Sequence, residues 1–231
     1  IKGGGHGDYK CIVLAPASAQ DMYDFVDLAF ELAFKYRNPA MILGDGVIGQ
    51  MMEKVELREP KPRRTEAEIR ALCDSWATIG CEGRHGNTIT SLSLDPVTQE
   101  NFNIHLQKKY DTIQENEVRY ATYRTEDAEH LIVAFGCMSR IGEAVVDLAR
   151  EQGIKLGLFR PITLFPFPKK EIDALVPQLK SIISLELNAG QMVEDIRLIV
   201  NGRIPVNFYG RQGGMIPDPE EILEAFLKTI K

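Results

Sequence analysis

The sequence predicts an α/β protein whose C-terminal part holds a mostly parallel sheet. From residue 128 onward, short apolar runs of strand length alternate with stretches in which apolar residues recur at helical spacing. The same strand–helix–strand order occupies residues 11–43. Parallel strands need long connections, which are usually helices, so this alternation favours a parallel sheet with helices on both of its faces.

The first elements form one strand–helix–strand unit. Residues 11–15 and residues 40–43 are apolar runs of strand length. The helix between them has Ser18 as a suitable N-cap, and the Asn38-Pro39 step ends it because the residue before a proline disfavours the helical conformation. Two strands make a poor sheet by themselves, so we expect the rest of this domain to come from upstream sequence that has been removed.

A more polar and irregular stretch follows, from residue 51 to about residue 124. Residues 59–64 are rich in proline and charge, which is typical of an extended connector. Thr65 and Glu68 have the spacing of a capping box, which predicts a helix to about residue 79. We further expect a short strand at 88–92 and a helix from residue 95 to about residue 109.

The last part of the chain is predicted to hold four strands, each followed by a helix. The strands are expected at 130–135, 155–159, 181–185 and 206–209, and the helices at about 141–152, 169–179, 191–200 and from 217 onward. We therefore divide the chain into the rear part of a first α/β domain (1–52), a bridging region (53–126) and a second α/β domain (127–231).

Composition excludes several classes of partner. The 231 residues have a formal net charge of -6 and no basic stripe, so nucleic acid is not an expected partner. No apolar run approaches the roughly 18 residues that cross a membrane, and we expect a cytoplasmic protein. The four cysteines contain no C-x-x-C pair, so their spacing predicts neither a zinc ribbon nor an iron–sulfur cluster.

Two glycine-rich motifs could each bind a ligand, but a loop or a turn without a ligand explains each sequence better. Residues 3–8 are rich in backbone N–H groups that suit a phosphate, yet they lead into a strand rather than a helix. The turn Gly44-Asp45-Gly46 is similar to the Gly-Asp-Gly motif that binds magnesium in thiamine diphosphate enzymes. That site also needs an asparagine about 25 to 30 residues further on, and residues 69–76 contain none. The histidines lack ligand spacing, so we predict no metal site.

The polar turns after the last strands form a candidate crevice. Ligands of open parallel sheets bind beyond the carboxyl ends of the strands, and five polar side chains are expected there. They are Ser139, Arg160, Glu186, Asn188 and Arg211. The two arginines beside glycine turns could hold an anion such as a phosphate or carboxylate. We favour the alternative that these turns contact another subunit, with Glu186 paired to an arginine.

Several motifs together resemble the alpha subunit of 2-oxoacid:ferredoxin oxidoreductases, and the resemblance covers essentially the whole chain. Those in the first part resemble the second half of that family's pyrimidine-binding domain, and they lie at 3–9, 14–18, 35–39 and 43–46. Those in the last part resemble its second domain, which is similar to the C-terminal domain of transketolase, and they lie at 159–168, 186–192 and 209–214. The glycine-rich start and the Leu-Gly-Asp-Gly turn look most like the branched-chain, or 2-ketoisovalerate, members.

The resemblance implies oxidative decarboxylation of a 2-oxoacid to an acyl-coenzyme A, with electrons passed to ferredoxin. It also implies a beta subunit that carries thiamine diphosphate and magnesium, together with gamma and ferredoxin-like subunits and iron–sulfur clusters outside this chain. The family's catalytic residues lie in the first half of the pyrimidine-binding domain, which is absent here. We therefore assign no catalytic, cofactor or metal residue, and expect the isolated chain to be inactive. The alternatives are a freestanding anion-binding or metabolite-binding module and a transketolase-like transferase.

Overall fold

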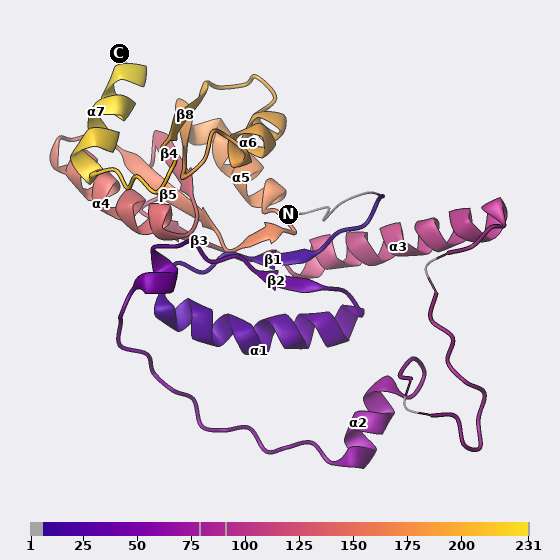
Figure 1. Cartoon of the computed structure of the whole chain (residues 1–231). Helices are drawn as coiled ribbons and strands as arrows, with labels where there is room; N and C mark the ends of the chain where they lie inside the picture. Colours follow the sequence, from indigo (N-terminus) through magenta and orange to yellow (C-terminus); the bar gives the residue numbers. More distant parts are fainter. Residues whose placement is uncertain (1–6, 79, 91, 231) are drawn as a thin grey trace. The chain divides into compact units, whose positions relative to one another are not determined.

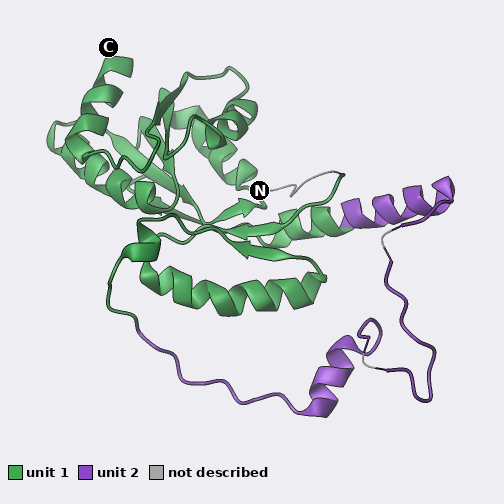
Figure 2. Ribbon diagram, in the orientation of Figure 1, with its two compact units in different colours: residues 1–55, 109–231 green, residues 56–108 purple. Residues whose placement is uncertain are grey.

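The computed structural model describes residues 7–78, 80–90 and 92–230. It contains two compact units, which are residues 1–55 with 109–231, and residues 56–108 (Figure 2). Of the glycine-rich motif at 3–8, only Gly7 and Asp8 belong to the described residues. None of the described helices combines the length and apolar character that a membrane span requires.

A three-stranded sheet with the order β2-β1-β6 lies in the first unit (Figure 1). β1 (Ile12–Leu14) is parallel to β2 (Ala40–Ile42), as expected for a strand–helix–strand unit. β6 (Thr163–Phe165) pairs with the other side of β1 in antiparallel orientation. No strand was predicted at the residues of β6, so this strand is a correction. It makes the third strand of the first sheet a part of the C-terminal half of the chain.

Helix α1 (Ala19–Tyr36) connects β1 to β2, and both of its ends match the prediction. The Ser18 hydroxyl accepts a hydrogen bond of 3.0 Å from the Asp21 N–H, which satisfies one of the free donors at the helix start. Arg37 ends the helix in the left-handed conformation, with φ at 45°. The buried Asn38 side chain then donates to the Lys10 carbonyl at 3.0 Å, which fixes the approach to β2.

A second sheet has the order β3-β5-β4-β7-β8. Its strands are β3 (Tyr120–Tyr123), β4 (His130–Ala134), β5 (Leu156–Pro161), β7 (Ser181–Glu186) and β8 (Val206–Gly210). All neighbours are parallel except β3, which is antiparallel to β5. The mostly parallel α/β sheet predicted from the sequence is confirmed, whereas β3 was not predicted.

Helices cover both faces of the second sheet (Figure 1). α4 (Cys137–Glu151) and α7 (Pro219–Thr229) pack with side chains such as Ile132 and Leu158 in one buried core. α5 (Lys169–Leu175), the 3-10 turn η2 (Val176–Gln178) and α6 (Met192–Val200) pack with Leu131 and Ile182 in another. Alternate residues of one strand thus enter opposite cores, as the two faces of a pleated strand require.

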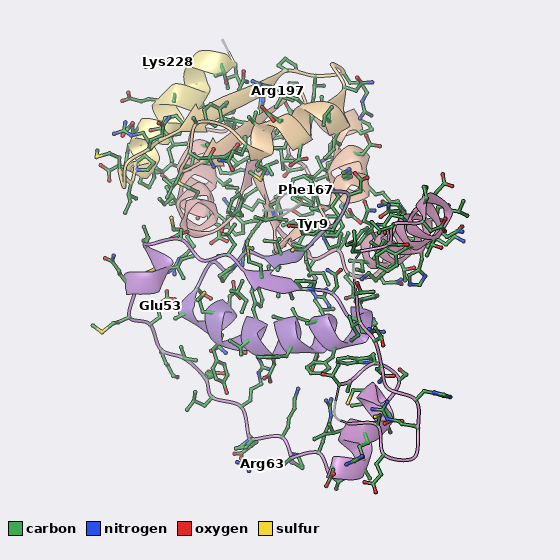
Figure 3. All side chains as sticks on the ribbon, turned by 45° about the vertical axis from the view of Figure 1, so that its right-hand side comes forward. Tyr9, Glu53, Arg63, Phe167, Arg197 and Lys228 are labelled. Atoms are coloured by element: carbon green, nitrogen blue, oxygen red, sulfur yellow. The ribbon has the colours of Figure 1, made fainter. Side chains whose placement is uncertain are left out.

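The second unit begins as an extended stretch in which Arg63 lies (Figure 3). Thr65 and Glu68 form the predicted capping box of α2 (Glu66–Cys73), with each backbone N–H donating to the other side chain. The strand predicted at 88–92 is wrong, because residues 88–90 and 92 have no regular structure and residue 91 lies outside the described residues. The predicted helix is present as α3 (Pro96–Asn116), which continues beyond its predicted end into residues of the first unit.

Candidate functional site

Ser139 and Arg160 were predicted to line the crevice. In the structure, both side chains form hydrogen bonds with other parts of this chain. Ser139 lies in the first turn of α4, is 1% exposed, and its hydroxyl donates to the Gly136 carbonyl at 2.7 Å. Arg160 lies within β5 and donates to the Asp21 carboxylate and, at 3.4 Å, to the Ala15 carbonyl. Its Nε is buried and has no hydrogen-bond partner among the described residues.

Glu186 is the last residue of β7, and its carboxylate caps the N-terminus of α6. Its carboxylate accepts hydrogen bonds from the backbone N–H groups of Gln191 at 3.0 Å, Met192 at 2.9 Å and Val193 at 2.8 Å. The Ser184 hydroxyl donates a further bond at 2.9 Å. Glu186 is 2% exposed, and these donors compensate its buried charge, as does the positive end of the helix dipole. Among the described residues, no arginine side chain pairs with the Glu186 carboxylate, because backbone and hydroxyl donors occupy it. The expected place of Glu186 in a contact with another subunit stays a prediction.

Asn188 and Arg211 are also engaged in their own turns. The Asn188 side-chain oxygen accepts from the Gly190 N–H at 2.7 Å, and Gly190 has a φ of 101° that suits glycine. Arg211 donates to the Glu221 carboxylate at 2.6 Å. Both candidate arginines thus face carboxylates, which reduces their attraction for a free anion.

Three of the five residues predicted to line one crevice line two different cavities. Glu186 and Asn188 line one of about 400 Å³, whose walls include Leu43, Leu164 and Phe167. Arg211 lines another of about 530 Å³. Ser139 and Arg160 line neither of these two. The five predicted residues therefore do not form one site, although the turns that hold Glu186 and Arg211 do lie at the carboxyl ends of neighbouring strands.

Asp45, in the Gly44-Asp45-Gly46 turn, joins the first sheet to the second. One carboxylate oxygen accepts from the N–H groups of Val47 and Ile48, both at 3.0 Å. The other accepts from the Cys137 N–H at 2.7 Å, at the start of α4. Burial, followed by the proximity of Asp45, raises the pKa of the Cys137 thiol to about 12. Sequence patterns predicted a glycine turn here but not this contact with α4, because Asp45 and Cys137 lie 92 residues apart.

The same carboxylate fits a magnesium site poorly, because both of its oxygens accept backbone N–H groups. Within the described residues, no group of three or more His, Cys, Asp or Glu side chains is arranged to hold a metal ion. We therefore derive no reaction step from a metal at Asp45.

Two further carboxylates connect the same parts of the chain. Asp21 accepts from Arg160 in β5 and, at 2.9 Å, from the Ala17 N–H. Glu53, which follows the 3-10 turn η1 (Ile48–Gln50; Figure 3), accepts from the Ala19 N–H at 2.9 Å and from Arg140 of α4. These bonds lower the pKa of the Glu53 carboxyl, with the Ala19 N–H making the largest contribution. Asp21, Asp45 and Glu53 thus fasten the loops after β1 and β2 to the second sheet.

A further carboxylate, that of Glu117, is buried at the other end of α1. It is 3% exposed and accepts hydrogen bonds from Lys35 and the Tyr36 hydroxyl, both at 2.6 Å, and from Arg119 at 3.0 Å. Burial raises the pKa of the Glu117 carboxyl, but these bonds outweigh it and the pKa is lowered overall. The charge of Glu117 therefore anchors the end of α1 to the start of β3.

Comparison with known families identifies both parts of the chain. The family described as "Pyruvate flavodoxin/ferredoxin oxidoreductase, thiamine diP-bdg" matches residues 5–127. The family described as "Pyruvate:ferredoxin oxidoreductase core domain II" matches residues 128–222.

Curated relatives show the same relationship. The chain is 47% identical to the ketoisovalerate oxidoreductase subunit VorB of Methanothermobacter marburgensis over 96% of this chain and 61% of that protein. It is 46% identical to VorB of Methanothermobacter thermautotrophicus, over 97% of this chain and 62% of that protein. The 2-oxoglutarate synthase subunit KorA of the latter organism is 31% identical, over 97% of this chain and 65% of that protein. The chain thus spans about three fifths of the length of the VorB proteins.

Solved structures share the fold. The 2-oxoglutarate:ferredoxin oxidoreductase from Magnetococcus marinus superposes with a TM-score of 0.74 at 21% identity, over 99% of this chain and 44% of that one. A split-gene transketolase gives a TM-score of 0.52 at 13% identity, over 94% of this chain and 56% of that one. The family predicted from the sequence motifs is confirmed by the matches to both parts of the chain. The chain belongs to the 2-oxoacid:ferredoxin oxidoreductase family.

Proposed function

We propose that the chain is a part of the alpha-type subunit of a thiamine diphosphate-dependent oxidoreductase that acts on branched-chain 2-oxoacids. In the overall reaction, a 2-oxoacid anion and coenzyme A give an acyl-coenzyme A, carbon dioxide and a proton, and two electrons pass to ferredoxin. The observation that supports this substrate class is the identity of 46–47% with two VorB proteins. Identity with the KorA proteins, which have nearly the same coverage of this chain, is 29–32%.

In this proposal, residues 1–52 are the rear part of the pyrimidine-binding domain, 53–126 are a bridge and 127–231 are the second domain. A beta subunit holds thiamine diphosphate and magnesium, and coenzyme A reacts in the assembled complex. Iron–sulfur clusters lie on gamma and ferredoxin-like subunits. The poor fit of Asp45 to a metal supports this division of labour, since its carboxylate serves as a backbone acceptor instead.

In this proposal, the chain supplies no catalytic group and instead holds the loops after β1 and β2 in place for the partner subunits. Asp21, Asp45 and Glu53 each accept both a backbone N–H from residues 17–48 and a donor from the second sheet or α4. A loop that is held at several points loses little conformational entropy when a partner binds it. We infer that the loops after β1 and β2 are presented to the partner subunits in a preformed arrangement.

A replacement experiment tests the proposed function. This chain is exchanged for the matching part of VorB from Methanothermobacter marburgensis, and the chimaera is coexpressed with the other subunits of that enzyme. We expect ferredoxin reduction that depends on 2-ketoisovalerate and coenzyme A, with weaker rates for 2-oxoglutarate and pyruvate. A complex that assembles but prefers 2-oxoglutarate would contradict the branched-chain assignment.

The isolated chain provides the complementary test. Supplied with thiamine diphosphate, magnesium, coenzyme A, 2-ketoisovalerate and ferredoxin, it is expected to give no turnover, because it has no identified catalytic group. Measurable turnover by the purified chain would show that the chemistry does not require partner subunits.

A further inference from the structure

Three side chains hold the loop after β2 against α4. Asp45 accepts a hydrogen bond from the Cys137 N–H at 2.7 Å, and Glu53 accepts one from the Arg140 guanidinium. Between these two contacts, Met51 packs against the buried core that α4 and α7 cover. Its sulfur lies 3.9 Å from Nη1 of Arg140, which is the same nitrogen that donates to Glu53. One nitrogen of α4 therefore contacts both a carboxylate and a thioether of this loop.

The Glu53 carboxylate also connects this loop to α1. Its second oxygen accepts a hydrogen bond of 2.9 Å from the N–H of Ala19, the first residue of that helix. The side chain of Glu53 is 24% exposed and that of Arg140 is 43% exposed. An ion pair so near the surface is weak, so a new acceptor beside Arg140 competes with Glu53 for it.

Met51 is accessible to a small oxidant. It lines the cavity of about 530 Å³, which admits molecules of the size of water or hydrogen peroxide. Met215 lines the same cavity and is 54% exposed, and Met52 is 99% exposed. In the described part of the chain, neither of these two methionines packs against the core that Met51 contacts. Oxidation of Met51 therefore has a structural consequence that oxidation of its two neighbours lacks.

We propose that Met51 is a redox-sensitive contact, and that its oxidation by a peroxide loosens the loop after β2. The thioether sulfur attacks one oxygen of hydrogen peroxide, so that an S–O bond forms and the O–O bond breaks. After a proton transfer, the other oxygen leaves as water. The sulfur loses two electrons, the peroxide gains them, and the product is methionine sulfoxide.

The sulfoxide weakens the hold of α4 on the loop in either of its orientations. Turned toward the core, its polar oxygen disrupts the apolar packing of Met51, because a buried polar group without a partner costs free energy. Turned toward Arg140, the oxygen is a better acceptor than the thioether and competes with Glu53 for Nη1. Enzymatic reduction of the sulfoxide restores methionine, so the change is reversible. This inference concerns contacts within the chain and does not rest on the proposed function.

Hydrogen exchange of the purified chain, before and after treatment with dilute hydrogen peroxide, tests the inference. We expect oxidation to speed exchange at the N–H groups of Ala19 and Cys137, which donate to this loop, by about fivefold or more. Met51→Leu stays apolar and forms no sulfoxide, so its exchange should be unchanged by peroxide. Met52→Leu and Met215→Leu are the matched controls and should respond to peroxide as the wild type does. Peptide mapping by mass spectrometry identifies the oxidised methionines.

A further variant needs no oxidant. Met51→Gln places a polar acceptor in the same position, and we expect faster exchange at Ala19 and Cys137 without peroxide. Urea denaturation verifies that each variant is folded. A peroxide response that persists in Met51→Leu, or unchanged or slower exchange in wild-type chain with sulfoxide at Met51, would overturn the inference. So would a Met51 that stays reduced while Met52 and Met215 are oxidised.

Discussion

The Asp45 carboxylate accepts a hydrogen bond of 2.7 Å from the Cys137 N–H, which lies 92 residues further along the chain. Asp45 comes from the turn after β2, and Cys137 is the first residue of α4. One side chain therefore caps a helix that belongs to the other sheet. This contact gives a structural role to an aspartate whose sequence setting suggests a cofactor motif.

Removal of the Asp45 side chain is expected to destabilise the chain. Asp45→Ala leaves the N–H groups of Val47, Ile48 and Cys137 without their acceptor, which costs about 1–3 kcal/mol in the free energy of unfolding. Asp45→Asn keeps one acceptor oxygen and should cost less. Urea denaturation followed by circular dichroism measures both, and an Asp45→Ala variant as stable as the wild type would contradict the capping role.

Gly136, just before α4, is expected to tolerate no side chain. Its φ is 64°, and an added Cβ would lie 2.6 Å from an Asp45 carboxylate oxygen. Gly136→Ala should therefore destabilise the fold by more than Gly153→Ala, where φ is 78° and no atom lies within 4 Å of the added Cβ. Gly153→Ala carries the strain of a positive φ, of about 1–3 kcal/mol, without a contact with Asp45. Equal loss of stability in the two variants would show that the approach of Asp45 is unimportant.

Glu186 should be the most sensitive acidic residue of the β7–α6 turn. Glu186→Gln replaces an acceptor oxygen by an NH₂ group in a site made of donors, and we expect a loss of about 1–3 kcal/mol in unfolding free energy. The exposed Glu194, two residues into α6, provides the control, since Glu194→Gln should change stability by less than about 0.5 kcal/mol. Denaturation at pH 7 compares them, and similar losses would refute the proposed capping of α6.

The lowered pKa of Glu117 predicts that the free energy of unfolding falls as the pH becomes acidic. Its folded-state pKa is lowered, so the folded state binds a proton less readily than the unfolded state. The contribution of Glu117 is therefore present above the unfolded pKa of about 4.3 and disappears as pH falls through the folded value. Glu117→Gln should lower stability at pH 7 and reduce its pH dependence below about pH 5. Parallel pH curves for the variant and wild type would argue against this linkage.

Local patterns in the sequence were sufficient to predict the parallel strands and several helix ends. Residues 181–185 are apolar enough to identify a buried strand, and Ser18 and Thr65 are caps whose partners lie within a few residues. These features depend on neighbours along the chain, so periodicity and capping rules find them.

Elements that depend on distant partners were not predictable in this way. β6 has three residues in a proline-rich run, and its strand character comes from pairing with β1 near the other end of the chain. β3 is an exposed edge strand without a clear apolar pattern. Conversely, residues 88–90 and 92 have suitable side chains but no neighbouring strand among the described residues. The Asp45–Cys137 contact was missed for the same reason, since its signal is spatial rather than sequential.

The pairing of β6 with β1 has a consequence for the continuity of the polypeptide. The sheet built from β2, β1 and β6 takes strands from both sides of residues 56–108, so its integrity does not depend on the covalent connection between them. A trypsin cut after Arg63, in the extended stretch, would leave two fragments that remain bound and copurify under native conditions. We therefore expect the two halves to complement each other when they are produced as separate peptides.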